Sequence, residues 1–390
     1  MTRTALLLLT LLLASCMATV PREVSGGITR EQVLAGEPLL AGDAAPPLPE
    51  VDMLALDQPM RDFLDRHVDR RANSHLRLQQ LVHAVIDKGS FGLNYSEATR
   101  TAAGTFAARD GNCLSFTNMF VAMARAVGLA VRYQQIDIPP DWEQRGELFV
   151  LNRHVNVLVD LGPAAQKVVD FNIADFKSSY DRHAVSDQRA EAHYYSNMGA
   201  EKFQAGDLRA AFLYLRRGLQ ADDSFSPLWT NLGTVYLRAG ALAHAEASYL
   251  QALRQDRSDM VAISNLARLY ERRGDSARAA RYRELAQRHR NNNPWYRYQQ
   301  ARAAFFARDY DKALEDLDFA IRRKPGEDSF HFLRGMVHLQ RGDTRRARAD
   351  LERAEAVTAA DSPKRNYHSR MELLLPQVRT AGTASSRTRR

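Results

Sequence analysis

The 390-residue sequence predicts an α+β domain followed by an all-α solenoid. Between residues 192 and 361 the chain repeats its pattern every 34 residues, which indicates stacked helix pairs. Before the repeats, an apolar helical run is followed by segments in which β-branched residues alternate with other residues, as they do in strands. Ahead of both regions, the chain opens with a short apolar segment that ends at Cys16.

The first sixteen residues are typical of a targeting segment. A positively charged residue precedes an apolar run over residues 5–13, which is too short to span a bilayer as a folded helix. The run ends in Leu13-Ala14-Ser15-Cys16, which is similar to a bacterial lipobox. The resemblance implies that residues 1–16 are a lipoprotein signal segment and that Cys16 carries a diacylglycerol after cleavage. An ordinary cleaved signal peptide and a retained anchor are the alternatives.

Two further segments are predicted to lack a packed core. Residues 17–50 contain several prolines and glycines and are predicted to be a flexible tether. Residues 362–390 form a basic tail, whose end is rich in Ser, Thr, Ala and Arg and is predicted to be disordered. These limits leave residues 51–185 for the first domain and residues 192–361 for five repeats.

Composition and charge exclude few functions. Hydrophobic residues make up 45% of the chain and charged residues 26%, so buried cores are expected. The net charge of +8 is spread over many arginines and accompanies no nucleic-acid motif, so no nucleic-acid partner is expected. No apolar run of spanning length follows the first segment. The remainder is therefore expected to lie on one side of the membrane, and the lipobox implies a lipid-anchored protein of the bacterial cell envelope that faces the periplasm.

Cys113 is the most informative residue of the first domain. If Cys16 is acylated, Cys113 is the single thiol that remains. An apolar run from Phe120 to Val127 predicts a helix that ends before Gly128 and begins near this cysteine. A cysteine in the first turn faces unsatisfied backbone N–H groups and the positive end of the helix dipole, and both favour the thiolate. The alternative is a small apolar residue at the start of a buried helix.

Three segments after this helix have the character of strands. Residues 131–136 form the first, and a turn is predicted at Pro139 and Pro140. Residues 147–160 form the second, in which β-branched residues alternate with other residues. Residues 168–171 form a short third strand that contains a carboxylate.

The order of these elements predicts a thiol site. Two antiparallel strands joined by a loop can set His154 and Asp170 side by side, with the N-terminus of the Cys113 helix packed against the sheet. In that arrangement the imidazole takes the thiol proton, and the carboxylate orients and stabilises the imidazolium.

Residues 75–180 resemble the transglutaminase-like (papain-like) superfamily. The resemblance is strongest over residues 98–128, which include Arg109-Asp110-Gly111-Asn112-Cys113, and it continues through the two strands that follow. It implies that Cys113 is the nucleophile, that His154 is the general base and then the acid, and that Asp170 is the orienting residue.

The resemblance implies chemistry rather than a substrate. The family includes cross-linking transglutaminases, peptidases, amidases and inactive members, and many carry an aromatic residue soon after the histidine where this chain has Val155-Asn156-Val157. We expect acyl transfer from peptide or protein amides through a thioester, without a cofactor. One usable cysteine and no paired His/Cys spacing argue against a metal site. The alternative is a scaffold lipoprotein without catalytic activity.

The repeats resemble tetratricopeptide (TPR) units. Their predicted limits are 192–225, 226–259, 260–293, 294–327 and 328–361. One position is alanine in all five units, at Ala211, Ala245, Ala279, Ala313 and Ala347. The signature Trp229-x-x-Leu232-Gly233-x-x-Tyr236 lies in the second unit, whereas Arg308 replaces the glycine of the turn in the fourth.

The first helices of such arrays line a concave face, where we expect a protein or peptide partner to bind. Counting along the units places arginine and aromatic side chains there, a composition that suits an acidic or C-terminal peptide segment. The candidate partner-binding residues are Arg238, Arg268, Arg272, Arg302, Trp295 and Tyr298. Alternatively, some of the aromatic residues pack between repeats.

Overall fold

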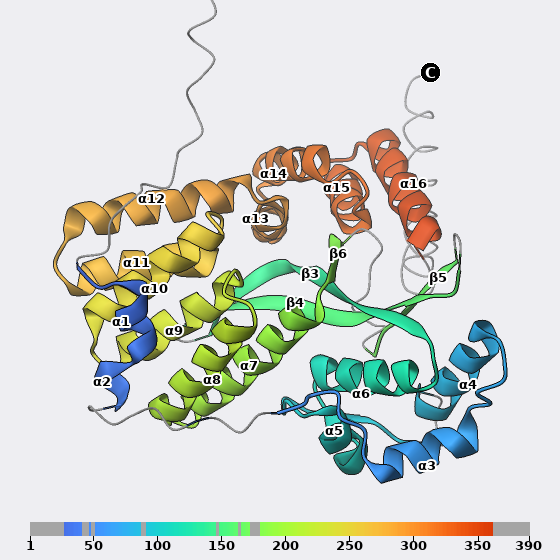
Figure 1. Ribbon diagram of the computed structural model, residues 1–390. Coiled ribbons are helices and arrows are strands. Elements are labelled where there is room, and N and C mark those ends of the chain that lie inside the picture. The colour runs from blue at the N-terminus through green and yellow to red at the C-terminus, as the bar shows by residue number, and fades with distance from the viewer. Residues whose placement is uncertain are drawn as a thin grey trace, which may run out of the picture.

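The computed structural model describes residues 27–40, 47, 51–86, 91–145, 148–162, 165–171 and 180–361, with the side chains of 138–153 and 358–361 left out. The predicted signal segment with Cys16 and the predicted tail over 362–390 lie outside the described residues. Figure 1 shows an α+β domain beside an all-helical array, so the predicted fold class is confirmed.

The first domain is built around one buried helix. The helices before the sheet are α3 (Gln58–His67), α4 (Ser74–Ile86), α5 (Ala102–Ala108) and α6 (Cys113–Ala126). Every residue of α6 from Leu114 to Ala124 is buried, because the other helices and the sheet surround it (Figure 1). As predicted, α6 begins at Cys113 and ends just before Gly128, which has a positive φ of 74°. A short parallel pair, β1 (Asn94–Tyr95) and β2 (Asp110–Gly111), leads into its start.

Four antiparallel strands form the sheet. They are β3 (Ala130–Arg145), β4 (Leu148–Asp160), β5 (Gln166–Val169) and β6 (Arg182–Val185), in the order β5-β4-β3-β6. The core between sheet and helix contains Tyr133, Val155, Val157 and Val159, all of which are buried. The alternation that predicted the second strand therefore marks the valines that face this core.

The predicted turn at Pro139 and Pro140 is wrong. Strand β3 continues to Arg145, and the register with β4 shifts between Asp137 and Trp142. Proline has no N–H to donate to a ladder, so an irregular stretch of a strand tolerates it. The β3–β4 hairpin is consequently longer than the sequence suggested.

The array contains five helix pairs among the described residues, one for each predicted unit. They are α7 (Asp187–Gln204) with α8 (Leu208–Ala221), α9 (Ser226–Arg238) with α10 (Leu242–Gln255), α11 (Met260–Arg272) with α12 (Ser276–Asn292), α13 (Pro294–Phe306) with α14 (Tyr310–Arg323), and α15 (Asp328–Gln340) with α16 (Thr344–Asp361). The first helix begins five residues before the predicted limit of 192.

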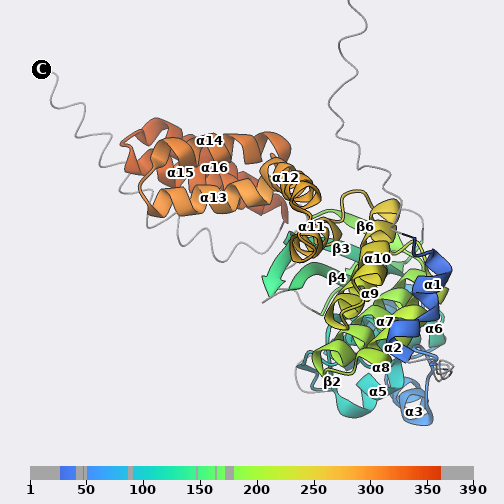
Figure 2. The same ribbon diagram turned by 90° about the vertical axis from the view of Figure 1, so that its left-hand side faces the viewer.

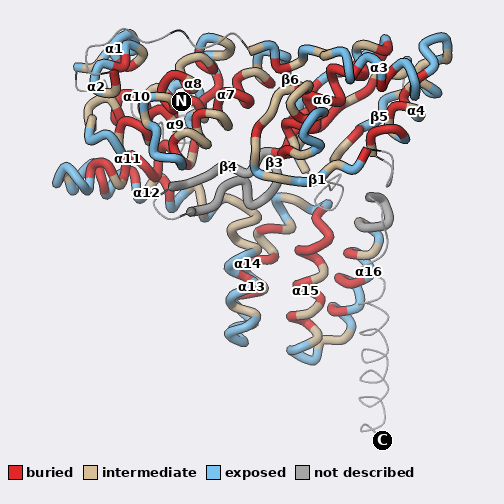
Figure 3. The backbone as a smooth tube through the Cα atoms, turned by 90° about the horizontal axis from the view of Figure 1, so that it is seen from below, coloured by how far each residue is buried: buried red, intermediate tan, exposed pale blue. Residues whose placement is uncertain are grey.

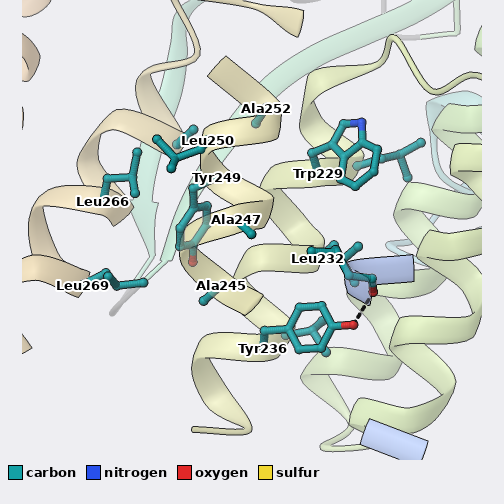
Figure 4. Packing of buried hydrophobic residues seen from close by; sticks show 14 of the residues in the cluster. Trp229, Leu232, Tyr236, Ala245, Ala247, Tyr249, Leu250, Ala252, Leu266 and Leu269 are labelled. Atoms are coloured by element: carbon teal, nitrogen blue, oxygen red, sulfur yellow. Dashed lines mark hydrogen bonds between the residues drawn. The ribbon is translucent and has the colours of Figure 1, made fainter. Parts of the chain in front are cut away.

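Close helix crossing explains the small residues of the repeats. The alanine shared by all units is fully buried in each of them. A Cβ added at Gly233 would come within 2.6 Å of the Tyr249 ring, so the two helices of the second repeat could not pack as they do. Figure 4 shows this tightly packed region, with Trp229 and Tyr236 pointing into it from α9.

The array has two separate cores. Buried residues of the first three repeats form one cluster, and those of the last two form another. Figure 2 and Figure 3 show the last two repeats extending away from the first three. The turn between α13 and α14 also differs from the others, because Arg308 adopts a left-handed φ of 63° where the other repeats have glycine.

Part of the predicted tether is folded, so that prediction is wrong for residues 27–40. Helices α1 (Arg30–Ala35) and α2 (Glu37–Leu40) pack on the array, and Val33 and Leu40 are buried in its core. Thr29 caps α1 through a capping box with Gln32, and the Tyr236 hydroxyl donates to the Val33 carbonyl oxygen (Figure 4). Burial of the apolar side chains offsets the entropy of ordering this segment.

The array curves around the sheet of the first domain. Three of its first helices, α7, α11 and α13, contact strand β3 or β4 (Figure 1). Part of the inner face of the array is therefore in contact with strands β3 and β4 of the first domain.

Candidate active site

Cys113 lies at the first position of α6, half-buried and not in a disulfide. The Asn112 side chain caps the helix by accepting a hydrogen bond from the Ser115 backbone N–H at 3.0 Å. The same side chain donates to the Thr99 hydroxyl at 2.8 Å, which ties the cap to the preceding loop. These contacts hold the sulfur at the end of the helix where the dipole favours a negative charge.

The entry to α6 requires a glycine. Gly111 has a φ of 157°, and a Cβ there would lie 2.6 Å from the Ser115 Cβ. The loop before it is held by an ion pair between Arg100 and Asp110, with Nε and Oδ1 2.6 Å apart. The Arg109-to-Cys113 sequence thus gives the chain a tight approach to the helix start.

His154 and Asp170 meet across strands β4 and β5. The register pairs Val157 with Val169, which places Asp170, just past the end of β5, beside the His154 end of β4. His154 Nε2 lies 2.7 Å from Asp170 Oδ1, and both side chains are only 7% exposed. A bond of this length between buried partners is charge-assisted.

The electrostatics of His154 link all three residues. Burial acts to lower the pKa of His154, but hydrogen bonds to Asp170 and Cys113 and the negative charges of both partners outweigh it and raise the pKa to about 10. Because Nε2 faces Asp170, the Nδ1 side of the ring is left for Cys113. The raised pKa favours the imidazolium form of His154 at neutral pH. The structure brings the three predicted residues together.

Models of known families match both regions of the chain. The model described as the transglutaminase-like superfamily matches residues 63–159, and two tetratricopeptide-repeat models match residues 226–259 and 298–363. The chain carries a transglutaminase-like domain followed by TPR repeats.

No curated protein matches the sequence. Solved structures with similar repeats include YrrB, described as a TPR protein with an unusual peptide-binding site (18% identity, 43% of this chain and 87% of that one, TM-score 0.24). MamA is 20% identical over 43% of this chain and 91% of its own, with a TM-score of 0.25. PilF of Pseudomonas aeruginosa is 13% identical over 52% and 94%, with a TM-score of 0.26. These likenesses concern the repeats and say nothing of function.

Two of the candidate partner-binding residues of the TPR array also contact a neighbouring repeat. The Trp295 ring contacts Phe330 edge-on with centroids 4.7 Å apart, and the Tyr298 ring lies 5.1 Å from the same phenylalanine. Trp295 also meets Tyr180, which precedes β6 of the transglutaminase-like domain. Both residues are half-buried, so these contacts leave part of each side chain accessible, and their role in binding a partner stays a prediction.

The four candidate arginines differ in their exposure to solvent. Arg238, Arg272 and Arg302 are exposed, and Arg268 is half-buried. The Arg238 guanidinium lies 5.0 Å from the centre of the Phe203 ring, and Arg302 donates to the Gln299 side chain at 3.2 Å.

Sequence reasoning missed Asn156. Its Nδ2 donates to Asp170 Oδ2 at 2.8 Å, so it belongs to the same hydrogen-bonded group as His154. The available signal was its position two residues after His154, which puts both side chains on one face of β4. Among the residues that the structure describes, no group of three His, Cys, Asp or Glu side chains could hold a metal ion. Nor does any helix in the described part of the chain have the length and apolar character to cross a membrane.

Proposed function

We propose that the transglutaminase-like domain is a thiol-dependent acyl transferase or hydrolase that acts on peptide or protein amides. The observation that supports it most directly is the placement of the His154 imidazolium between the Asp170 carboxylate and the Cys113 sulfur. A buried cation held next to a thiol at a helix N-terminus is what a sulfur nucleophile requires.

The reaction follows from this arrangement. The Cys113 thiolate attacks the amide carbon, and a C–S bond forms as the carbonyl electrons move onto oxygen. When the tetrahedral intermediate collapses, the C–N bond breaks and the His154 imidazolium gives its proton to the leaving amine. Water or a second amine then attacks the thioester, His154 takes the proton of that nucleophile, and the thiolate leaves.

The start of α6 also supplies a donor for the oxyanion. The first N–H groups of a helix have no partner within the helix, and that of Cys113 lies at the first position. A backbone N–H in this place can stabilise the negative oxygen of the tetrahedral intermediate.

The TPR array is proposed to recruit a protein partner or substrate. Part of its inner face contacts the strands that lead to His154, so a partner that binds the exposed Arg238, Arg272 and Arg302 would lie beside the transglutaminase-like domain. Guanidinium groups pair well with carboxylates, which favours an acidic or C-terminal peptide segment.

The lipobox supports a place for the protein in the bacterial envelope. We expect Cys16 to be acylated and residues 1–15 to be removed, so that the acyl chains anchor the protein to a membrane. Cys16→Ser should give an unprocessed or mislocalised precursor that takes up no labelled fatty acid. Unchanged labelling of that variant would refute the anchor.

An acyl-trapping experiment tests the catalytic proposal. The protein is incubated with a peptide phenyl ester, with and without a fluorescent primary amine, and the Cys113 peptide is examined by mass spectrometry. A thioester on Cys113 that is absent from the Cys113→Ala variant supports the proposal, and the products distinguish hydrolysis from amine transfer. A Cys113 that forms no thioester and reacts with iodoacetamide no faster than a buried thiol would favour a scaffold without catalytic activity.

A further inference from the structure

Asn156 lies at the centre of the hydrogen-bonded group behind His154. It is fully buried in strand β4, and its side-chain N–H donates to Oδ2 of Asp170 at 2.8 Å. The other carboxylate oxygen, Oδ1, faces His154 Nε2 at 2.7 Å. The two oxygens of Asp170 are thus held by two side chains of one strand, two residues apart.

The orientation of the Asn156 amide follows from its partner. A carboxylate only accepts hydrogen bonds, so the nitrogen of the amide must face Asp170 and the oxygen must point away. That oxygen is buried and meets no donor among the described residues. An apolar side chain of similar size would avoid that orphaned acceptor, but it would leave Oδ2 of the buried Asp170 carboxylate without this donor. The asparagine at this position therefore serves the Asp170 carboxylate.

We propose that Asn156 is a positioning residue of the thiol site, which fixes the Asp170 carboxylate so that Oδ1 remains directed at His154. A carboxylate with one anchored oxygen cannot turn about its Cβ–Cγ bond without breaking that hydrogen bond. The orientation of Asp170 then determines how strongly it holds the imidazolium. The catalytic consequence rests on the proposed function, but the effect on His154 does not.

The ionisable groups that interact with His154 come from two other elements. Cys113 approaches from the start of α6, and Asp170 approaches from the end of β5. Both raise the pKa of His154 against the effect of burial. If Asp170 loses its anchor, its contact with the imidazolium becomes weaker, and His154 should give up its proton at a lower pH.

The test compares Asn156→Leu with a matched control, Asn118→Leu. Asn118 is also fully buried, its Oδ1 accepts from the Tyr133 hydroxyl at 2.9 Å, and its Nδ2 has no acceptor among the described residues. Unlike Asn156, Asn118 makes no contact with Asp170 among the contacts that the structure shows. The full chain of each variant is titrated by NMR of the His154 ring nitrogens. The rate of Cys113 alkylation by iodoacetamide is measured from pH 5 to pH 10.

We expect Asn156→Leu to lower the deprotonation midpoint of His154 by about 0.5 to 1 pH unit, and the control to leave it unchanged. Alkylation of Cys113 serves as a check that the thiol stays accessible in each variant, since a His154 midpoint of about 9 to 10 leaves the ring protonated at pH 6.5 in all of them. Unfolding temperatures should fall moderately in both variants, because each change leaves one buried polar group without its partner. An unchanged His154 midpoint in folded Asn156→Leu, or an equal shift in Asn118→Leu, would overturn the proposal.

A second variant, Asn156→Ala, covers the case in which Asn156→Leu does not fold. It removes the same donor to Asp170 without adding bulk, so it should also lower the His154 midpoint. An unchanged or raised midpoint in the folded variant contradicts the proposal. The His154 titration also separates this inference from the proposed function, because it reports on Asp170 even if Cys113 forms no thioester.

Discussion

The thiol site and the inner face of the TPR array were both predicted from residue types at suggestive positions, yet the structure holds them differently. His154 and Asp170 are buried and joined at 2.7 Å, whereas Arg272 and Arg302 are exposed. A charge removed from water needs a partner, so the geometry of the buried pair is determined by the fold. An exposed guanidinium has water as its partner and is not restricted in the same way. Buried polar residues are thus better guides to a site than exposed ones.

The aromatic residues of the array differ from the exposed arginines, because their rings contact a neighbouring repeat. Trp295 and Tyr298 lie on a first helix, as the repeat period predicted, but their rings pack against Phe330. The period gives the helix and its approximate face. It does not reveal whether a neighbouring repeat covers that face.

The largest expected effect is that of Cys113→Ala, which removes the proposed nucleophile. Turnover of a peptide ester should be lost, while the unfolding temperature changes little, because Cys113 is half-buried and forms no disulfide. Binding of a natural partner to the array should persist. Parallel turnover, binding and melting assays check this, and residual turnover close to that of the wild type would exclude Cys113 as the nucleophile.

Asp170→Asn should reduce turnover of the same ester by about 100-fold or more. The asparagine amide keeps the shape of the carboxylate but lacks its negative charge. Its N–H group would also face one of the two donors, His154 or Asn156, where a carboxylate oxygen now accepts a hydrogen bond. Steady-state rates on the ester measure the effect. Asp181→Asn is a suitable control, because that carboxylate pairs with Lys324 of the array and not with His154. A similar loss in both variants would argue for a general effect on folding.

Stability should depend on pH through His154. Its pKa in the folded protein, about 10, lies above the ordinary 6.5, so the stabilisation is complete below about pH 6.5 and is lost as the pH rises through about 10. The difference in unfolding free energy between the wild type and His154→Gln should therefore shrink over this range, by on the order of 2 kcal/mol. Chemical denaturation at pH 6.5, 8 and 10 measures it. A difference that stays constant between pH 8 and pH 10 would show that the pKa of His154 is not raised in the folded state.

Replacement of Arg268, Arg272 and Arg302 together by alanine should weaken partner capture about 10-fold at low salt and make it less sensitive to salt. Turnover of the small ester should hardly change, because that substrate does not need the array. Binding is measured with a partner trapped on the Cys113→Ala protein from envelope extract. If the folded triple variant loses turnover of the small ester, the array must help to build the active site.

The smallest expected effect concerns the turn of the fourth repeat. Arg308→Gly should stabilise the protein by less than about 1 kcal/mol, because glycine adopts the left-handed φ of 63° without the strain of a Cβ. The reverse change, Gly274→Ala, places a Cβ at a φ of 73° with open space around it, so it should destabilise through the backbone alone. Thermal melts of the two variants should shift in opposite directions.

Much of the molecule could be predicted because the relevant signals are local. The start of α6 depends on its own first turn, the repeat depends on close contacts between adjacent helices, and the valines of β4 alternate as any half-buried strand does. Cys113, His154 and Asp170 were predicted from the order of these elements. The missed Asn156 contact and the wrong Pro139-Pro140 turn depend on neighbours across the sheet.

Local patterns in the sequence were thus enough to predict the helix at Cys113, the strands after it and the 34-residue period, and to single out Cys113, His154 and Asp170 as candidates. The folded structure shows which surfaces are covered: it places α1 and α2 on the array, packs Trp295 against Phe330 and sets the β3–β4 hairpin along the first helices. The physical reason is that helix starts, turns and alternation depend on residues a few positions apart. Which surfaces are covered depends on the burial of apolar surface between segments that are distant in the chain. A local sequence pattern contains no information about those contacts.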